Sequence, residues 1–236
     1  MLGQLANDIN LLQKQLIFAI NGFHVGSEPE HQASVAQAML AERLLAGRLN
    51  EAYEFTRSAR CHAATRDYEA DLPDEWRVAR KSLNTYFGAD NLIRRVRNKL
   101  AFHSDVTTTR EAYDTVPPAE PMVDYVTLHQ GNCLWGSSDV LMGFAMISLA
   151  GEADPALALQ KIADDLIRVA SLLLTYIRHA QMSFVETYFP EKSLTEAPTY
   201  LNGPNLMQAR VPFYCSEPTA EQMNVAKIKG QDRPSD

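Results

Sequence analysis

The sequence predicts an all-α protein, a bundle of four to five long helices, and two kinds of observation support this fold class. Apolar residues recur at spacings of three and four in residues 2–20 and 159–184, which places them on one face of a helix. Acids and proline, which favour helix starts, occur at Pro73-Asp74 and Asp154-Pro155. We therefore expect a helical bundle with one continuous core.

The first half of the chain predicts three helices and the start of a fourth. The first spans residues 2–20, and a loop over residues 22–30 separates it from a second helix over residues 32–61, which is rich in good helix formers. A third helix begins after Pro73, and Asp90 is expected to cap a fourth. The third helix has a predicted buried stripe of Trp76, Ala79, Leu83 and Phe87.

The second half predicts an irregular insertion and one long helix. Residues 104–152 form the insertion, with a short β-hairpin in which residues 123–128 pair across Gln130–Asn132, and with a short apolar helix after Asp139. The last helix runs from Asp154 to about residue 189, roughly 50 Å at the rise of an α-helix, so a kink or break is an open alternative. We expect one bundle over residues 1–189 and a proline-rich arm, extended or partly disordered, over residues 190–236.

Composition limits the classes of function. A net charge of −7 excludes a general polyanion binder. Three scattered cysteines, Cys61, Cys133 and Cys215, favour a reducing compartment over a disulfide framework. The N-terminus lacks the pattern of a signal peptide, and the longest apolar run is too short to span a bilayer. These features predict a cytoplasmic protein with no membrane partner.

One basic segment stands out in this acidic chain. Between residues 77 and 99 a single acid, Asp90, accompanies seven bases, which are Arg77, Arg80, Lys81, Arg94, Arg95, Arg97 and Lys99. Such a local excess of positive charge predicts a specific anion site, and we assign Arg77, Arg80, Lys81, Arg94, Arg95 and Lys99 to nucleic-acid binding.

Within this segment, Arg97-Asn98 precedes His103 at the end of an expected helix. RNA carries its own nucleophile, the 2′-hydroxyl, so cleavage needs a base and a cation that stabilises charge on phosphorus. Histidine can move the proton, and arginine can hold two phosphate oxygens. On a straight helix His103 would lie about 120° around the axis from Arg97. The two side chains converge only if the helix ends near Phe102, or if a second copy of the chain supplies half of the site.

Other kinds of site have weaker support in the sequence. The histidines and Cys61 lack the spacings of metal ligands, and no glycine-rich phosphate loop is present. We therefore predict no metal and no cofactor. Tyr125 and Trp135 could stack on a base, although such aromatics more often anchor a loop.

The stretch Arg97-Asn98-Lys99-Leu100-Ala101-Phe102-His103 resembles the signature of HEPN domains, which is an arginine and a polar residue followed by a histidine after a short spacer. The residues after it, Ser104-Asp105, look like the abortive-infection and toxin-like branches. The resemblance implies an all-helical bundle that acts as a homodimeric, metal-independent RNA endonuclease, with Arg97 and His103 catalytic and Asn98 as the accompanying polar residue. It also implies a role as a toxin or phage-defence component, with an antitoxin protein as partner.

Two other interpretations stay open from the sequence. In the first, the chain is a non-catalytic helical module that binds nucleotides, nucleic acid or a partner protein through the basic segment. In the second, it is a purely structural dimer whose basic residues only pair with acids elsewhere in the chain.

Overall fold

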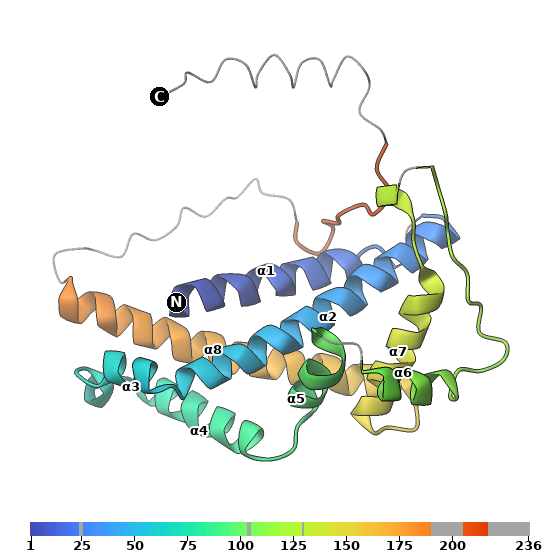
Figure 1. The fold of residues 1–236 in the computed structure, drawn as a ribbon. Coiled ribbons are helices and arrows are strands. Elements are labelled where there is room, and N and C mark those ends of the chain that lie inside the picture. Colours follow the sequence, from blue (N-terminus) through green and yellow to red (C-terminus); the bar gives the residue numbers. More distant parts are fainter. Residues whose placement is uncertain (24–25, 103–104, 129, 190–204, 217–236) are drawn as a thin grey trace, which may run out of the picture.

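The computed structural model describes residues 1–23, 26–102, 105–128, 130–189 and 205–216, and it is mostly helical. Three long helices lie roughly side by side in Figure 1: α1 (Leu2–Ile20), α2 (Glu28–Thr56) and α8 (Pro155–Tyr188). At one end of the bundle lie α3 (Ala59–Thr65), the 3₁₀ turn η1 (Glu69–Asp71) and α4 (Asp74–Gly88). At the other end lie α6 (Val106–Tyr113) and α7 (Gly136–Ala150). The all-α prediction is confirmed.

Two helix starts follow the sequence prediction closely. Helix α4 begins at Asp74, directly after Pro73, and its predicted stripe of Trp76, Ala79, Leu83 and Phe87 is buried. Helix α8 begins at Pro155, and the Asp154 side chain accepts hydrogen bonds from the first backbone N–H groups. The α8 helix then continues without a break for 34 residues.

The second predicted helix was wrong at both of its ends. Helix α2 begins at Glu28, because Ser27 and Glu30 form a capping box. It ends at Thr56, and a separate helix, α3, starts after Ser58, whose hydroxyl accepts a hydrogen bond from the Cys61 N–H at 3.2 Å. The sequence did not predict this break, because residues 32–61 are rich in helix-forming residues throughout.

The predicted insertion is less irregular than expected. It contains α6, the 3₁₀ turn η3 (Gln130–Asn132) and α7, and buried residues of both α-helices, Ala112, Ala145 and Met146, belong to the main core. The predicted β-hairpin was wrong in extent: in the described residues it reduces to one antiparallel bridge between Tyr125 and Leu134. Asp124 beside it accepts hydrogen bonds from the backbone and side chain of Ser137 at the start of α7, so this segment anchors a helix.

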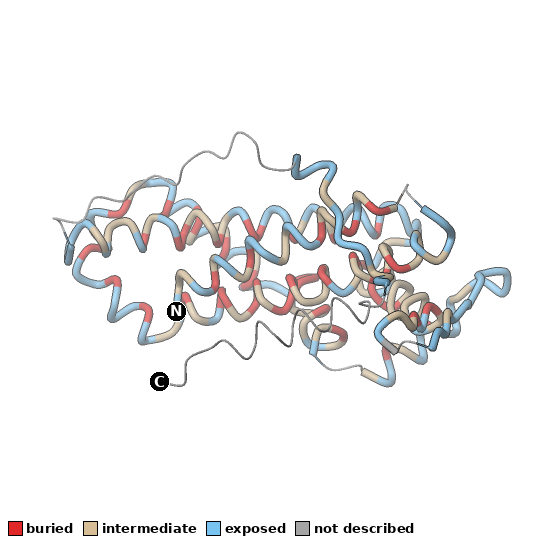
Figure 2. Tube along the Cα trace, turned by 90° about the horizontal axis from the view of Figure 1, so that it is seen from above, coloured by how far each residue is buried: buried red, intermediate tan, exposed pale blue. Residues whose placement is uncertain are grey.

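The core runs along the inward faces of α1, α2, α4, α5 (Leu92–Val96) and α8, which appear as the buried positions in Figure 2. The predicted stripe of α8 is core between Ile162 and Ala180, whereas its end residues Leu159 and Phe184 are 47% and 41% exposed. None of the described helices is by itself long and apolar enough to cross a membrane; α7 and α8 pass that test only as a pair bent by 77°.

Of the predicted C-terminal arm, the structure describes residues 205–216. This segment lies against the rest of the chain, because the side chain of Asn21 donates hydrogen bonds to the carbonyls of Leu206 and Ala209 at 2.9 and 2.8 Å. Phe213 and Tyr214 also pack against a small apolar cluster that includes Ala33 and Leu134. This part of the arm is therefore docked.

Candidate functional site at the end of the motif helix

The motif lies where an α-helix passes into a π-helical turn. Helix α5 (Leu92–Val96) is capped by Asn91, whose side chain accepts a hydrogen bond from the Arg94 N–H at 2.9 Å. The predicted cap, Asp90, was wrong by one residue, and Asp90 instead pairs with Arg95 at 2.8 Å. The chain continues as the π-helix η2 (Arg97–Ala101). Such wide turns are rare and are frequently found at functional sites.

The buried side of this segment agrees with the sequence pattern. Ile93, Val96 and Leu100, which are spaced three and four residues apart, form a buried stripe. Arg97 lies at the border of that stripe. Its Nη1 donates a hydrogen bond to Asn98 Oδ1 at 3.0 Å, and its Nε is buried without a partner among the described residues. Within the described part of the chain Arg97 has no carboxylate partner, so its charge is free for an anion.

The predicted proton-transfer residue, His103, lies outside the described residues. The helix itself ends at Ala101, and Phe102 already has non-helical angles of φ −120° and ψ −13°. This end point is the one under which Arg97 and His103 can converge. The relation between the two side chains stays a prediction.

The end of the π-turn packs against α2. A Cβ atom added to Gly47 would lie 2.7 Å from two ring atoms of Phe102 and 3.3 Å from the Ala101 Cβ. Gly47 therefore lets the end of the motif helix approach the backbone of α2.

We expect Gly47→Ala to reveal this contact in a double-mutant cycle. Alanine is about 1 kcal/mol better than glycine inside a helix, but in the wild-type background the Phe102 ring blocks its methyl group. Gly47→Ala should therefore stabilise the Phe102→Ala variant by up to about 1 kcal/mol and the wild type by clearly less. Urea denaturation of the four proteins measures the difference, and equal effects in both backgrounds would exclude the contact.

The basic segment does not form one uniform surface. Near the motif, Arg94 donates to the Phe87 carbonyl at 2.9 Å and lies 3.9 Å from Glu54, and Arg95 pairs with Asp90. Lys99 lies on the π-turn itself. Glu54 from outside the segment and Asp90 from within it thus neutralise part of its charge near the motif.

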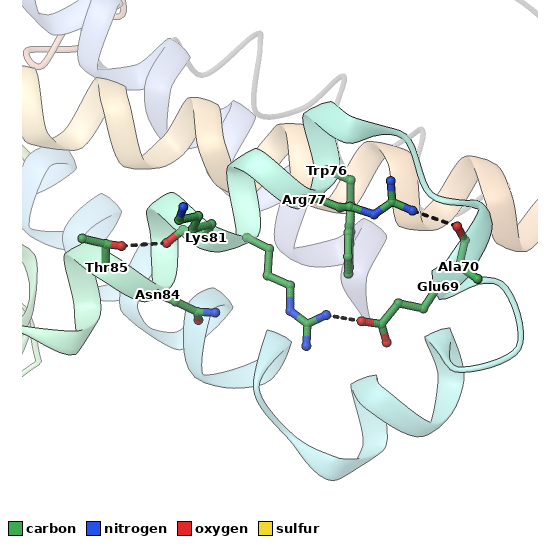
Figure 3. Close-up of a pocket in the computed structure, with 8 residues that line it drawn as sticks. Glu69, Ala70, Trp76, Arg77, Lys81, Asn84 and Thr85 are labelled. Atoms are coloured by element: carbon green, nitrogen blue, oxygen red, sulfur yellow. Dashed lines mark hydrogen bonds and ion pairs between the residues drawn. The ribbon is translucent and has the colours of Figure 1, made fainter.

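The remaining predicted nucleic-acid-binding residues lie along α4. Arg77 pairs with Asp74 at 2.8 Å and donates to the Ala70 carbonyl, and Arg80 pairs with Glu69. Lys81 is exposed and has no carboxylate partner among the described residues. All three line a hollow of about 580 Å³ between α4 and η1 (Figure 3). The basic segment therefore divides into a motif group and an α4 group.

The structure gives little support to a metal site, a cysteine nucleophile or base stacking by Tyr125 and Trp135. Across the described residues, no three His, Cys, Asp or Glu side chains come together as a metal site would require. Cys61 is buried with its Sγ 3.8 Å from the Tyr176 hydroxyl, and desolvation raises the pKa of its thiol, which disfavours a nucleophile. Trp135 is exposed, and Tyr125 takes part in the bridge to Leu134.

The sequence analysis missed three residues with unusual surroundings. Arg57 and Arg168 stack on aromatic rings beside α4, and Glu42 is a carboxyl group among apolar side chains of α5 and α7. No local pattern marks any of them, because each gains its role from residues distant in the chain. Comparisons with family models, with curated proteins and with solved structures find no match to this chain.

Proposed function

We propose that this protein is a metal-independent RNA endonuclease of the HEPN type that acts as a homodimer. The observation that carries the proposal is the guanidinium of Arg97, which has no carboxylate partner among the described residues and lies on a π-helical turn that ends at Ala101, shortly before His103. A buried donor without a partner costs about 1–3 kcal/mol, and a phosphate oxygen would offer the missing acceptor.

In the proposed reaction each motif residue has one task. The 2′-oxygen attacks phosphorus, and His103 accepts the proton of the 2′-hydroxyl. Arg97 binds the phosphoryl oxygens and stabilises their added charge. Asn98, through its 3.0 Å contact with Arg97, holds the guanidinium in place. The P–O5′ bond breaks, O5′ takes up a proton, and the products are a 2′,3′-cyclic phosphate and a 5′-hydroxyl.

Two subunits are part of the proposal, because the HEPN resemblance implies a homodimer in which the motifs of two subunits face each other. A two-fold axis that brings two motif turns face to face places Arg97 of one subunit near His103 of the other. A role as a toxin or phage-defence component, with an antitoxin as partner, belongs to the same proposal and depends on the same motif.

Mixing two inactive variants tests the composite site. We expect Arg97→Ala and His103→Ala homodimers each to be inactive, and their mixture to recover roughly a quarter of wild-type cleavage. This figure follows because about half of the dimers are mixed and each mixed dimer keeps one of two sites. The variants carry different tags, so that purified mixed dimers can be assayed in EDTA. Mixed dimers without activity would exclude a site shared between subunits.

The second candidate function is a non-catalytic module that binds nucleic acid. The hollow beside α4 favours it, since three basic side chains line a surface that the motif does not need. This candidate predicts salt-sensitive RNA binding without cleavage. The purely structural alternative has partial support in the ion pairs of Arg77, Arg80, Arg94 and Arg95, but these pairs leave Arg97 and Lys81 unexplained.

A further inference from the structure

Helix α4 is bordered by three hollows in series. The central hollow, of about 580 Å³, is the one drawn in Figure 3. It shares Arg80 and Asn84 with a second hollow of about 210 Å³, which reaches α3. It shares Lys81 and Thr85 with a third hollow of about 620 Å³, which reaches α8. Because neighbouring hollows share residues, they form one track, called here the α4 groove.

Each hollow contains an arginine stacked on an aromatic ring. The guanidinium carbon of Arg57 lies 5.6 Å from the centre of the Tyr53 ring, and Arg57 lines the second hollow. Arg80 lies 5.1 Å from the Trp76 ring in the central hollow. Stacking holds the flat face of a guanidinium against the ring and leaves its N–H edge to donate, so less entropy is lost when an anion binds. Arg80 already uses one of these N–H groups toward Glu69.

The third hollow repeats this arrangement. Arg168 lies 4.7 Å from the centre of the Tyr86 ring. The Tyr86 hydroxyl donates to Asp165 at 2.8 Å and accepts from the Ile93 N–H at 3.4 Å. Since Ile93 belongs to α5, this end of the groove is joined directly to the motif helix.

The groove is positively charged although the protein is acidic. Its lining includes one acid, Glu69, and five bases, which are Arg57, Arg77, Arg80, Lys81 and Arg168. Arg77, Arg80 and Arg168 have carboxylate partners, whereas Arg57 and Lys81 have none within the described residues. The excess positive charge of the groove therefore lies at Arg57 and at Lys81, and it attracts anions there.

The shape and the stacking indicate which anion fits. One isolated phosphate would need one hollow, whereas a row of three hollows, each with a preorganised arginine, matches successive phosphates of an extended strand. Tyr53 and Trp76 are each 2% exposed, and Arg168 lies 4.7 Å from the centre of the partly exposed Tyr86 ring. These rings therefore offer bases little surface to stack on, and contacts to the backbone dominate.

We propose that the α4 groove binds the phosphate backbone of single-stranded RNA, independently of sequence, and leads the strand toward the motif at α5. That the strand is RNA rests on the proposed function. Arg57, Arg80 and Arg168 are the main phosphate contacts, with Lys81 between the central and third hollows.

The test is binding of a fluorescent 12-nucleotide 2′-O-methyl RNA strand, which lacks the nucleophile and so separates binding from cleavage. The triple variant Arg57→Gln/Arg80→Gln/Arg168→Gln should bind about 10-fold or more weakly, and its slope of log K against log salt should fall by about 2, at about 0.7 per lost contact. The single variant Lys81→Gln should lower the slope by about 0.7. Lys81 is exposed and lacks a carboxylate partner in the described chain, so this variant keeps the test valid if the triple variant unfolds.

A matched control removes the same charge elsewhere. Lys14→Gln/Arg110→Gln/Arg210→Gln changes three exposed bases away from α4 and should bind as the wild type does. The groove proposal would be refuted if the wild-type protein did not bind the strand. It would also be refuted if the groove variants bound the strand as tightly as the control variant. If the groove variants lose binding and the wild-type protein does not cleave natural RNA, the proposed RNA-binding groove is supported and the proposed nuclease activity is refuted. If the protein bound inorganic polyphosphate more tightly than the RNA strand, the ligand of the groove would be another polyanion and the RNA assignment would be wrong.

Discussion

Replacing Arg97 by alanine is expected to lower RNA cleavage by about 100- to 1,000-fold, the usual effect of removing one group that stabilises charge in a transition state. Its thermal stability should change little, because Arg97 has no carboxylate partner among the described residues. The measurement is single-turnover cleavage of a labelled RNA in EDTA, with the melting temperature recorded for each protein.

Two further variants sharpen this result. Arg97→Lys keeps the charge but lacks the planar fork, so it should stay well below wild type. Arg110→Ala removes an exposed arginine on α6 and should cleave normally. His103→Ala should lose activity to a degree similar to Arg97→Ala, through loss of proton transfer. Equal cleavage by wild type, Arg97→Ala and His103→Ala would refute the nuclease proposal.

Replacing Glu42 by glutamine is expected to remove a pH dependence from the stability of the fold. Glu42 lies on α2 beside Leu92, Ile93 and Val96, and with Asp165 it lines a cavity of only about 10 Å³. Desolvation in this apolar setting raises the pKa of its carboxyl group from 4.5 to about 7.

The sign of the effect follows from linkage. Between pH 4.5 and about 7 the folded protein keeps a proton on Glu42 that the unfolded chain releases, so rising pH lowers the free energy of unfolding. Above that window both states are ionised and the loss is complete. A glutamine stays neutral throughout, so the advantage of Glu42→Gln over wild type should grow by about 2–3 kcal/mol between pH 4.5 and pH 8.

Urea denaturation of both proteins at pH 4.5, 6 and 8 measures this growth. Glu111→Gln, which removes an exposed carboxylate on α6, controls for the change in net charge. A constant difference between wild type and Glu42→Gln across the three pH values would show that the carboxyl group of Glu42 is well solvated.

The local signals of the sequence predicted the fold well where a helix start depends on neighbouring residues. Asp154 caps α8 through its side chain, and Pro73 followed by acids marks the start of α4 without a side-chain cap, so both signals act within one turn. The break between α2 and α3 could not be predicted in the same way. Its surroundings favour helix throughout, and only the bonds of Ser58 mark it.

The candidate site shows the same division. Arg97 and Asn98 are adjacent in the chain, so the sequence alone pairs them. The π-turn that carries them was not predicted, because five residues are too few to distinguish its period from that of an α-helix. Arg57 and Arg168 meet the α4 groove from α2 and α8, and only tertiary packing brings them there. Residue spacing within one helix could not have revealed them.

The continuous helix α8 has a consequence for synthesis of the chain. It packs against α1, α2 and α4, so the last long helix completes a core whose other walls are made much earlier. Helices α1 and α2 can pack against each other earlier, but until α8 has left the ribosome the apolar surface that it covers is open to aggregation or to chaperones. Nascent chains that stop within α8 should therefore be bound by holding chaperones and degraded, whereas the completed chain closes its core in one late step.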